Sequence, residues 1–393
     1  MNFRYDVCVV GGCGHVGLPL AMTLANAGQK TIILDKNQAA LEQVAAGKMP
    51  FKEEGADPLL KKVLRSGKLN FTDQTKCVAE SKHIVIIIGT PIDEFMNPKM
   101  QDIYKIFEDL LPRFKTGQTI ILRSTIYPGT TKMIGRLLKN DKKKVKLAFC
   151  PERVAEGKAI EEIKELPQII SGIDKASEAS AAKLFKLIAK EILILSPEEA
   201  ELAKLFTNSW RYIQFAVANQ FYMIADAAGV DFYKVFKAIK HNYPRTQGFP
   251  GPGFSAGPCL LKDTMQIAAF NNNQFYLGHS AMLINEGLPN YIVTKLKEKV
   301  ELHNKSVAIL GMAFKANNDD RRDSLAYKLK KLLEIEAKKV YCTDVYIKDE
   351  TFYDLKTALQ KSDIIILGAP HREYKKLKFR KGQIIIDIWN FWG

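Results

Sequence analysis

Short apolar runs alternate with longer segments of helical periodicity in the first half of the chain. An apolar-periodic helix ending near residue 27 follows the first of these runs. Strands separated by helices are typical of a parallel, doubly wound sheet. We therefore expect strands at 6–10, 31–34, 83–88, 119–122 and 146–149.

One long helix is predicted at 197–228, where the alternation ends. The segment Ser196-Pro197-Glu198-Glu199 is a good helix start, with a capping serine, a proline in the first turn and early acids. A Gly/Pro-rich region follows at 243–258, and helical sequence then continues to about residue 302.

A second alternating unit begins near residue 303, with strands expected at 306–310, 339–343, 363–367 and 383–387. The sequence thus predicts an α/β protein with two Rossmann-like doubly wound domains joined by a long central helix. The expected division is 1–195, an NAD-binding domain; 196–302, a helical linker with a cysteine loop; and 303–393, a second Rossmann-like domain.

Composition narrows the function classes only slightly. The 393 residues carry a net charge of +15 and six cysteines. The lysines are scattered, so we expect a solvated basic surface and no nucleic-acid partner.

No apolar run approaches the ~18 residues of a membrane helix, and the N-terminus lacks a signal-peptide pattern. We therefore expect no membrane insertion and a cytoplasmic protein. No cysteine or histidine spacing indicates a metal site.

The first loop with clear chemistry is Gly12-x-Gly14-x-x-Gly17, in which His15 and Val16 fill the last two variable positions. It follows a strand and opens a helix, as in loops that bring a pyrophosphate to a helix N-terminus. Asp35 lies 18 residues after Gly17, where a carboxylate binds the adenosine ribose. This favours NAD over NADP as the cofactor.

Polar residues also follow three later strands. Thr90 in Gly89-Thr90-Pro91 and Thr125 in Ser124-Thr125 lie beyond strand ends, where doubly wound sheets bind ligands. Glu152 and Glu156 follow the next strand and could act as substrate contact and general base. Ordinary turns and a solvated loop are the alternatives for these residues.

The central region offers a nucleophile. Lys204 and Asn208 are one turn apart on the long helix and could stabilise an oxyanion. Cys259 follows a Gly/Pro loop where a helix begins, a position that favours a thiolate. Asp263 lies one turn later and could orient water. A buried, inert thiol is the alternative for Cys259.

Together these motifs resemble the nucleotide-sugar 6-dehydrogenases, which include UDP-glucose dehydrogenase and the UDP-N-acetylhexosamine dehydrogenases. The resemblance spans essentially the whole chain. It rests on the glycine loop with Leu18-Pro19-Leu20-Ala21, Ser124-Thr125 with Pro128-Gly129-Thr130, Pro151-Glu152, Lys204 with Asn208, Gly257-x-Cys259-x-x-Lys262-Asp263, and Gly311-x-x-x-Lys315 with Asp319-Asp320-x-Arg322-x-Ser324.

The resemblance implies an NAD domain, a helical linker that forms a homodimer, and a C-terminal UDP-sugar domain. It also implies a four-electron oxidation of the sugar C6 alcohol to a uronate, through a thiohemiacetal and a thioester on Cys259, supplying precursors of surface polysaccharides. Two other functions stay open. They are a two-electron NAD dehydrogenase of the β-hydroxyacid or polyol-phosphate type, and a non-catalytic nucleotide-sugar binding protein.

The resemblance assigns roles residue by residue. Lys204 and Asn208 stabilise oxyanions and contact substrate; Asp263, Thr125 and Glu156 serve the water and proton steps. Thr90 and Thr125 contact NAD. The substrate set is Glu152, Arg153, Arg245 (reaching from the neighbouring subunit), Gly253, Phe254, Lys315 and Arg322.

Two features of the sequence bear on loop geometry and substrate. The family usually has two glycines before the cysteine, whereas this chain has Ala256-Gly257. The runs Leu18-Pro19-Leu20-Ala21 and Pro151-Glu152-Arg153-Val154 are similar to the N-acetylhexosamine branch, but Lys262-Asp263 is more like the UDP-glucose branch. We expect a 2-acetamido sugar, with UDP-glucose as the alternative.

Overall fold

The computed structural model describes residues 3–90, 92–93, 96–140, 143–254 and 257–393. Pro91 of the Gly-Thr-Pro turn and Ala256 of the cysteine loop lie outside these residues. The chain divides into two compact units, Met1–Phe206 and Thr207–Gly393, and the division falls within one long helix. The three-part division expected from sequence stays a prediction.

The first unit is built on an eight-stranded sheet in the order β3-β2-β1-β4-β5-β6-β7-β8. Its first six strands are parallel, β7 runs antiparallel to β6, and β8 is parallel to β7. The strands are β1 (Tyr5–Val10), β2 (Thr31–Leu34), β3 (Leu69–Thr72), β4 (Ser81–Ile86), β5 (Thr119–Leu122), β6 (Lys146–Phe149), β7 (Gln168–Gly172) and β8 (Ile192–Ile194).

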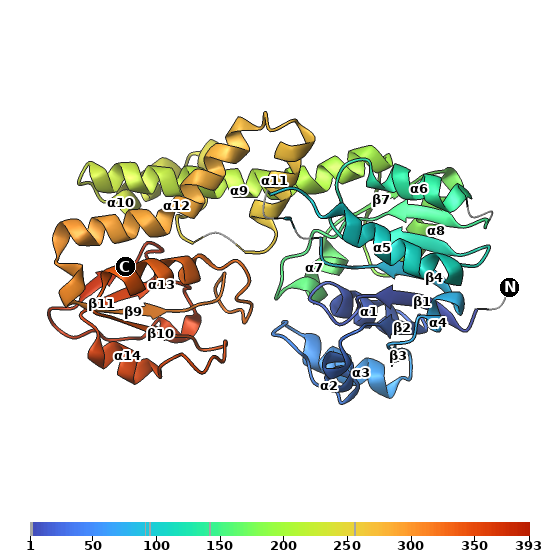
Figure 1. The fold of residues 1–393 in the computed structure, drawn as a ribbon, viewed down its shortest axis with the longest axis horizontal. Coiled ribbons are helices and arrows are strands. Elements are labelled where there is room, and N and C mark those ends of the chain that lie inside the picture. Colours follow the sequence, from blue (N-terminus) through green and yellow to red (C-terminus); the bar gives the residue numbers. More distant parts are fainter. Residues whose placement is uncertain (1–2, 91, 94–95, 141–142, 255–256) are drawn as a thin grey trace. The chain divides into compact units, whose positions relative to one another are not determined.

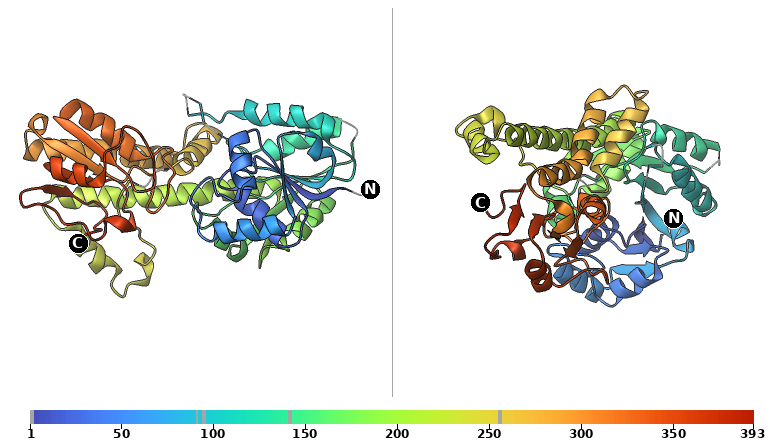
Figure 2. Two further views of the ribbon diagram at one scale, coloured as in Figure 1. Left: turned by 90° about the horizontal axis from the view of Figure 1, so that it is seen from below. Right: turned by 60° about the vertical axis from the view of Figure 1, so that its left-hand side comes forward.

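Helices cover both faces of this sheet (Figures 1 and 2). One buried apolar cluster involves α1, α2, α3, α7 and α8, and the other involves α4, α5 and α6. The helices are α1 (Gly17–Asn26), α2 (Gln38–Ala45), α3 (Ala56–Arg65), α4 (Lys76–Ala79), α5 (Met100–Leu110), α6 (Thr130–Asn140), α7 (Ala159–Glu165) and α8 (Lys175–Phe185).

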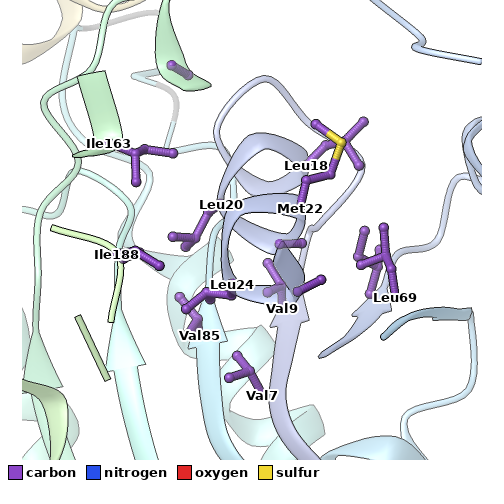
Figure 3. Close-up of a cluster of buried hydrophobic side chains, with 14 of the residues drawn as sticks. Val7, Val9, Leu18, Leu20, Met22, Leu24, Leu69, Val85, Ile163 and Ile188 are labelled. Atoms are coloured by element: carbon purple, nitrogen blue, oxygen red, sulfur yellow. The ribbon is translucent and has the colours of Figure 1, made fainter. Parts of the chain in front are cut away.

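Successive side chains of β1 point to opposite faces of the sheet and so belong to different apolar clusters. Val7 and Val9 point to the first cluster, where they pack with Leu20 and Leu24 of α1 (Figure 3). Cys8 and Val10 belong to the second cluster. A strand covered on both faces reads as a continuous apolar run, which is why the sequence pattern identified it.

Helix α9 (Pro197–Ala227) matches the predicted long helix. Its start is a reciprocal cap: the Ser196 amide donates to Glu199 Oε2 at 2.7 Å, and the Glu199 amide donates to Ser196 Oγ at 3.3 Å. These bonds satisfy backbone donors that a helix start would otherwise leave without partners. Within the described part of the chain, no helix is both long enough and apolar enough to cross a membrane.

The second unit holds a four-stranded parallel sheet in the order β10-β9-β11-β12. Its elements are α10 (Phe232–Lys240), the 3-10 turn η2 (Pro244–Thr246), α11 (Leu260–Phe270), α12 (Tyr276–Lys299), β9 (Ser306–Leu310), α13 (Leu325–Glu336), β10 (Lys339–Thr343), α14 (Leu355–Lys361), β11 (Ile364–Leu367) and β12 (Ile384–Ile386). Two buried clusters, one on each face of the sheet, form its core. The predicted fold class, with two Rossmann-like domains and a long central helix, is therefore confirmed.

Candidate active site

Three glycines of the loop after β1 differ in what surrounds them. A Cβ on Gly12 would lie 2.8 Å from the Ile33 side chain, and one on Gly17 would lie 2.6 Å from the Gly11 carbonyl oxygen. Gly14 is exposed, and a Cβ there would meet nothing nearer than 3.8 Å. Packing thus explains Gly12 and Gly17, whereas Gly14 leaves open space for a ligand to approach the backbone.

The same loop ends at the N-terminus of α1. Val16 precedes the helix, and its first turn contains no acidic residue. The amides and the dipole of a helix start favour an anion, and no acidic side chain of the first turn opposes it. The His15 ring stacks on Phe51 with the centroids 4.1 Å apart, which fixes the loop beside the helix start. The loop therefore fits a dinucleotide pyrophosphate.

Asp35 follows β2 and turns back to this loop. Its Oδ2 accepts the Cys13 amide at 2.9 Å, and its Oδ1 accepts the Asn37 amide at 3.0 Å. The residue is half-buried, so its carboxylate remains accessible at the edge of the sheet. This arrangement suits the hydroxyls of an adenosine ribose and disfavours a 2′-phosphate.

The ends of β4 and β5 are joined beside the predicted cofactor residues. Ser124 Oγ accepts the Ile88 amide at 2.7 Å, which ties the two post-strand segments together. Thr90 is buried and Thr125 is half-buried on these segments. Both threonines therefore lie beyond carboxyl ends of parallel strands, where the sequence analysis placed them.

Glu201 was missed from the sequence, although it organises the next helix start. Its carboxylate on α9 accepts the Gly129 amide at 2.6 Å, the Thr131 amide at 2.8 Å and the Thr131 hydroxyl at 2.6 Å. It is an N-cap for α6 supplied from a distant part of the chain. Such a cap leaves no local sequence signal, because Glu201 is 70 residues from Thr131.

Glu152 is held by a buried network. Its carboxylate pairs with Arg123, whose guanidinium also donates to the Cys150 carbonyl at 3.0 Å and to Gln168 Oε1 at 2.9 Å. Glu152 Oε1 accepts the Arg153 amide at 2.7 Å. The geometry makes Glu152 a residue that shapes the loop after β6, in addition to the substrate contact predicted for it.

Glu156 lies, half-buried, on the same loop. Glu53 fixes the end of this loop by accepting the Gly157 amide at 2.9 Å and the Ala159 amide at 2.6 Å. The Arg153 side chain donates to the Pro167 carbonyl, and burial lowers its pKa. Glu53 was also missed, because it lies about a hundred residues before the loop that it holds.

Two predicted residues of the second unit meet directly. Asn208 Nδ2 on α9 donates to Asp263 Oδ2 on α11 at 2.5 Å, and Lys262 Nζ lies 3.5 Å from Asp263 Oδ1. The Asp263 side chain is fully buried. Lys204, one turn before Asn208 on α9, is also buried. Buried polar groups of this kind need such partners, since an unpaired one is costly.

Cys259 differs from the other five cysteines. It is exposed, whereas Cys8, Cys13, Cys77, Cys150 and Cys342 are buried. It occupies the N-cap position of α11, as the sequence predicted. Burial raises the pKa of Cys150 to about 12, and the same holds for Cys13 and Cys342, so these thiols stay protonated at neutral pH.

In the cysteine loop, whose described residues are 251–254 and 257–259, close contacts surround two glycines. A Cβ on Gly253 would lie 2.3 Å from the Trp389 ring, and one on Gly257 would lie 2.5 Å from the Phe314 ring. The Gly253 amide donates to Asn219 Oδ1 at 2.8 Å. Asn219 in turn donates to Asn285 at 2.9 Å, and both are fully buried. This amide chain anchors the loop to α9 and α12.

Beyond β9, the two predicted nucleotide-binding cations have defined neighbours. The Arg322 guanidinium donates to both carboxylate oxygens of Asp320, from Nε to Oδ1 at 3.0 Å and from Nη2 to Oδ2 at 2.5 Å. Lys315 Nζ lies 5.6 Å from the centroid of the Phe314 ring. Phe254 is buried in the core of this unit. Arg245 is exposed on η2, where it donates to the Tyr243 hydroxyl at 3.2 Å.

Comparison with known proteins identifies the family. Residues 5–189 match the NAD binding domain of the UDP-glucose/GDP-mannose dehydrogenase family, 198–286 match its central domain, and 308–393 match its UDP binding domain. The chain belongs to the UDP-glucose/GDP-mannose dehydrogenase family. It is therefore an NAD-dependent oxidoreductase that oxidises a UDP-sugar, as the resemblance implied.

Individual members of this dehydrogenase family resemble the chain over nearly its full length. The UDP-N-acetyl-D-mannosamine dehydrogenase of Methanocaldococcus jannaschii is 32% identical over 98% of this chain and 92% of its own. The solved UDP-N-acetylmannosamine dehydrogenase of Pyrococcus horikoshii is 28% identical, with a TM-score of 0.89 over 95% of this chain and 91% of its own. The corresponding S. aureus enzyme is 26% identical, with a TM-score of 0.86 over 98% and 95%.

Proposed function

We propose that this dehydrogenase converts the C6 alcohol of UDP-N-acetylmannosamine to the uronate, with Cys259 as the covalent nucleophile. The observation that carries the proposal is that the Cys259 thiol is exposed at a helix start, whereas the other five cysteines are buried. The choice of sugar is supported by the named activity of the similar enzymes from M. jannaschii and P. horikoshii.

The start of α11 activates Cys259 in this proposal. A helix N-terminus favours the thiolate, which is the nucleophilic form of cysteine. The thiolate adds to the C6 aldehyde to give a thiohemiacetal, and removal of the second hydride converts this to a thioester. Hydrolysis by water then frees the thiolate and the uronate. NAD, when bound, supplies the oxidising power by accepting one hydride in each of two rounds.

Lys204 and Asn208 stabilise the negative oxygen of these intermediates. Asp263 takes one N–H of the Asn208 amide and thereby sets the plane of the side chain, so that the second N–H has a defined direction. A preorganised donor of this kind stabilises developing charge without rearranging first. Glu156 and Thr125 serve the hydrolytic water and the proton path.

The decisive measurement is the number of NADH formed per sugar consumed, with UDP-N-acetylmannosamine, UDP-N-acetylglucosamine, UDP-N-acetylgalactosamine and UDP-glucose in turn. Two NADH with the first sugar support the proposal. One NADH per sugar would indicate the two-electron alternative, and no turnover with UDP binding intact would indicate the non-catalytic one.

Replacement of the nucleophile gives an independent test. We expect Cys259→Ser to lower uronate formation by at least about a thousandfold, because a serine hydroxyl is a far weaker nucleophile at neutral pH. NAD binding should be unchanged, since the cofactor residues lie in the first unit. Normal uronate production by this variant would overturn the covalent role of Cys259.

We also propose a homodimer that forms through α9. Trp210, Val217, Phe221 and Ile224 are all exposed, with 61% of Trp210 accessible. At 100° per residue they fall within about 60° of one helix face. An exposed apolar stripe of this kind is typical of a protein–protein interface. In a two-fold symmetric dimer, the stripe on one α9 would pack against the same stripe on the second copy.

Light scattering with size-exclusion chromatography tests the dimer. We expect the double variant Trp210→Glu with Phe221→Glu to run as a monomer and Arg211→Glu, an exposed control on the same helix, to stay dimeric. A wild-type monomer would refute the proposal.

For location, we propose the cytoplasm, because an exposed catalytic thiol remains reduced there. Cell fractionation tests this.

A further inference from the structure

His371 lies where the segments after β9, β10 and β11 meet in the second unit. Its Nε2 is 3.1 Å from Asp344 Oδ2, and its Nδ1 is 2.9 Å from the backbone nitrogen of Asn317. The side chains of His371 and Asp344 are both fully buried. A backbone amide can only donate, so Nδ1 is the acceptor and the imidazole donates to Asp344 through Nε2–H.

Asp344 collects donors from two further segments. Its Oδ2 also accepts the Met312 amide at 2.6 Å and the Ala313 amide at 3.1 Å. Its Oδ1 accepts the amides of Tyr346 and Ile347. Burial works against the charged form, but the bonds from His371 and the amides outweigh it and lower the pKa of Asp344. The carboxylate is thus an ionised hub inside the fold.

Asp35 of the first unit holds the equivalent place at the end of the second strand, and it likewise accepts an amide from the glycine loop. It differs in being half-buried, whereas the side chain of Asp344 is fully enclosed. In the first unit, the acid at this place is the one expected to bind a ribose. In the second unit, the corresponding acid is Asp344, and it binds protein groups, among them His371.

Asn317 is linked by one bond to His371 and by a second to the next residue, Arg372. The Asn317 amide donates to His371 Nδ1, and the amide of Arg372 donates to Asn317 Oδ1 at 2.9 Å. Asn317 has φ of 55°, a left-handed conformation that residues with a Cβ adopt less readily than glycine. It lies between Lys315 and Arg322, so fixing Asn317 fixes the middle of the segment that carries both cations.

We infer that His371 is a positioning residue for the substrate nucleotide, which holds residues 312–322 in the form that binds the UDP phosphates. The inference rests on the proposed function and on the role that the family resemblance implies for Lys315 and Arg322, contact with the nucleotide. The imidazole does not touch substrate in this role. It acts through Asn317 on one side and Asp344 on the other.

Two conservative substitutions separate the two bonds. In His371→Asn, the side-chain oxygen can take the place of Nδ1 and accept from Asn317. In His371→Gln, the side-chain nitrogen can take the place of Nε2 and donate to Asp344. Because Asn317 is the direct link to the cations, we expect Asn to restore substrate binding better than Gln, with His371→Leu the weakest.

The experiment is calorimetric titration of each variant with UDP alone, followed by steady-state kinetics with the preferred UDP-sugar and with NAD. We expect Kd for UDP and KM for the sugar to rise about tenfold in His371→Gln and His371→Leu, the effect of one lost hydrogen bond, and less than about threefold in His371→Asn. KM for NAD should stay unchanged. His303→Asn, an exposed histidine before β9, is the control.

Three results would overturn the inference: unchanged UDP binding in all variants, equal losses in the Asn and Gln variants, or a parallel rise of KM for NAD. If His371→Leu does not fold, the Asn and Gln pair still decides the matter. A wild-type protein that binds UDP but oxidises no UDP-sugar would refute the proposed function, while the UDP titrations would still test His371.

Discussion

Gly257 and Gly251 lie in the same cysteine loop but have different surroundings. Gly257 has φ of +102° and faces the Phe314 ring, whereas a Cβ on Gly251 would meet no atom within 4 Å. Alanine at 257 would therefore suffer both backbone strain and a clash, while alanine at 251 would suffer neither.

The first prediction follows from this difference. Gly257→Ala should lower the free energy of unfolding by roughly 2–4 kcal/mol, or displace the loop and lower kcat at least about tenfold. Gly251→Ala should behave like wild type. Urea unfolding and steady-state kinetics check both, and equal behaviour of the two variants would contradict the packing argument.

His83 on β4 predicts a pH effect on stability. It is buried, its Nδ1 contacts the Asp6 carbonyl oxygen at 3.0 Å, and burial lowers its pKa from 6.5 to about 4. Between these values the unfolded chain binds a proton that the folded one does not. Stability from this group is therefore fully present above pH 6.5 and is lost as the pH falls to about 4.

We expect His83→Gln to remove this part of the acid sensitivity. The slope of the unfolding free energy between pH 6.5 and 4 should be smaller in the variant by up to about 1.4 kcal/mol per pH unit. Denaturant titrations at several pH values measure it, and His303→Gln is an exposed control. An unaltered slope in His83→Gln would assign the acid sensitivity to other groups.

At the scale of elements, helix α9 carries both Glu201 and Lys204, the lysine proposed to stabilise oxyanions. Glu201 caps α6 through Gly129 and Thr131, and Lys204 is three residues further along the same helix. The cap therefore fixes α9 against the loop that carries Thr125. Removal of the carboxylate leaves three donors without their acceptor, each of which is costly when buried.

Glu201→Ala should consequently lower the free energy of unfolding by about 2–4 kcal/mol and lower kcat as well, because Lys204 loses its fixed position. Glu198→Ala, an exposed acid in the first turn of the same helix, should change neither. Thermal unfolding and kinetics on the two variants give the comparison. Loss of stability without loss of kcat would limit Glu201 to a structural role.

The elements themselves were largely predictable from sequence. The strands at 31–34, 119–122, 146–149, 306–310 and 339–343 have the predicted bounds. Those at 31–34 and 119–122 are buried throughout, and strands covered on both faces read as continuous apolar runs. Strand β4 spans Ser81–Ile86 where 83–88 was expected, and strands β3, β7 and β8 were not predicted. Strand β7 is antiparallel to β6, and an apolar run does not reveal the direction of a strand. The partners of Glu201, Glu53 and Asn219 were equally hidden, since each lies far along the chain from the group that it binds.

At the scale of the whole molecule, the proposed dimer raises the question of whether one active site draws on two chains. Arg245 is exposed on η2, and its side chain stacks near Tyr243, with 5.5 Å from the guanidinium carbon to the ring centroid. The family resemblance assigns this arginine to the substrate of the neighbouring subunit. Complementation between two inactive variants distinguishes action in trans from action in cis.

We expect Cys259→Ser and Arg245→Ala to be nearly inactive alone and to recover about a quarter of wild-type activity when refolded together. Random mixing places half of the chains in heterodimers, and one of the two sites in each has both an intact Cys259 and an intact neighbouring arginine. A mixture that stays inactive would show that Arg245 serves its own subunit or forms no shared site.

The double use of Asp35 constrains how this enzyme could change its cofactor. Its carboxylate accepts the Cys13 amide of the glycine loop, and it is also the group that we expect to bind the adenosine ribose. A substitution of Asp35 that makes room for a 2′-phosphate also removes the acceptor of the Cys13 amide. The same change that relaxes the preference for NAD over NADP therefore destabilises the glycine loop. Lineages with this arrangement should rarely drift to NADP by single substitutions, and laboratory evolution toward NADP should first select a second change that supplies a new acceptor for Cys13.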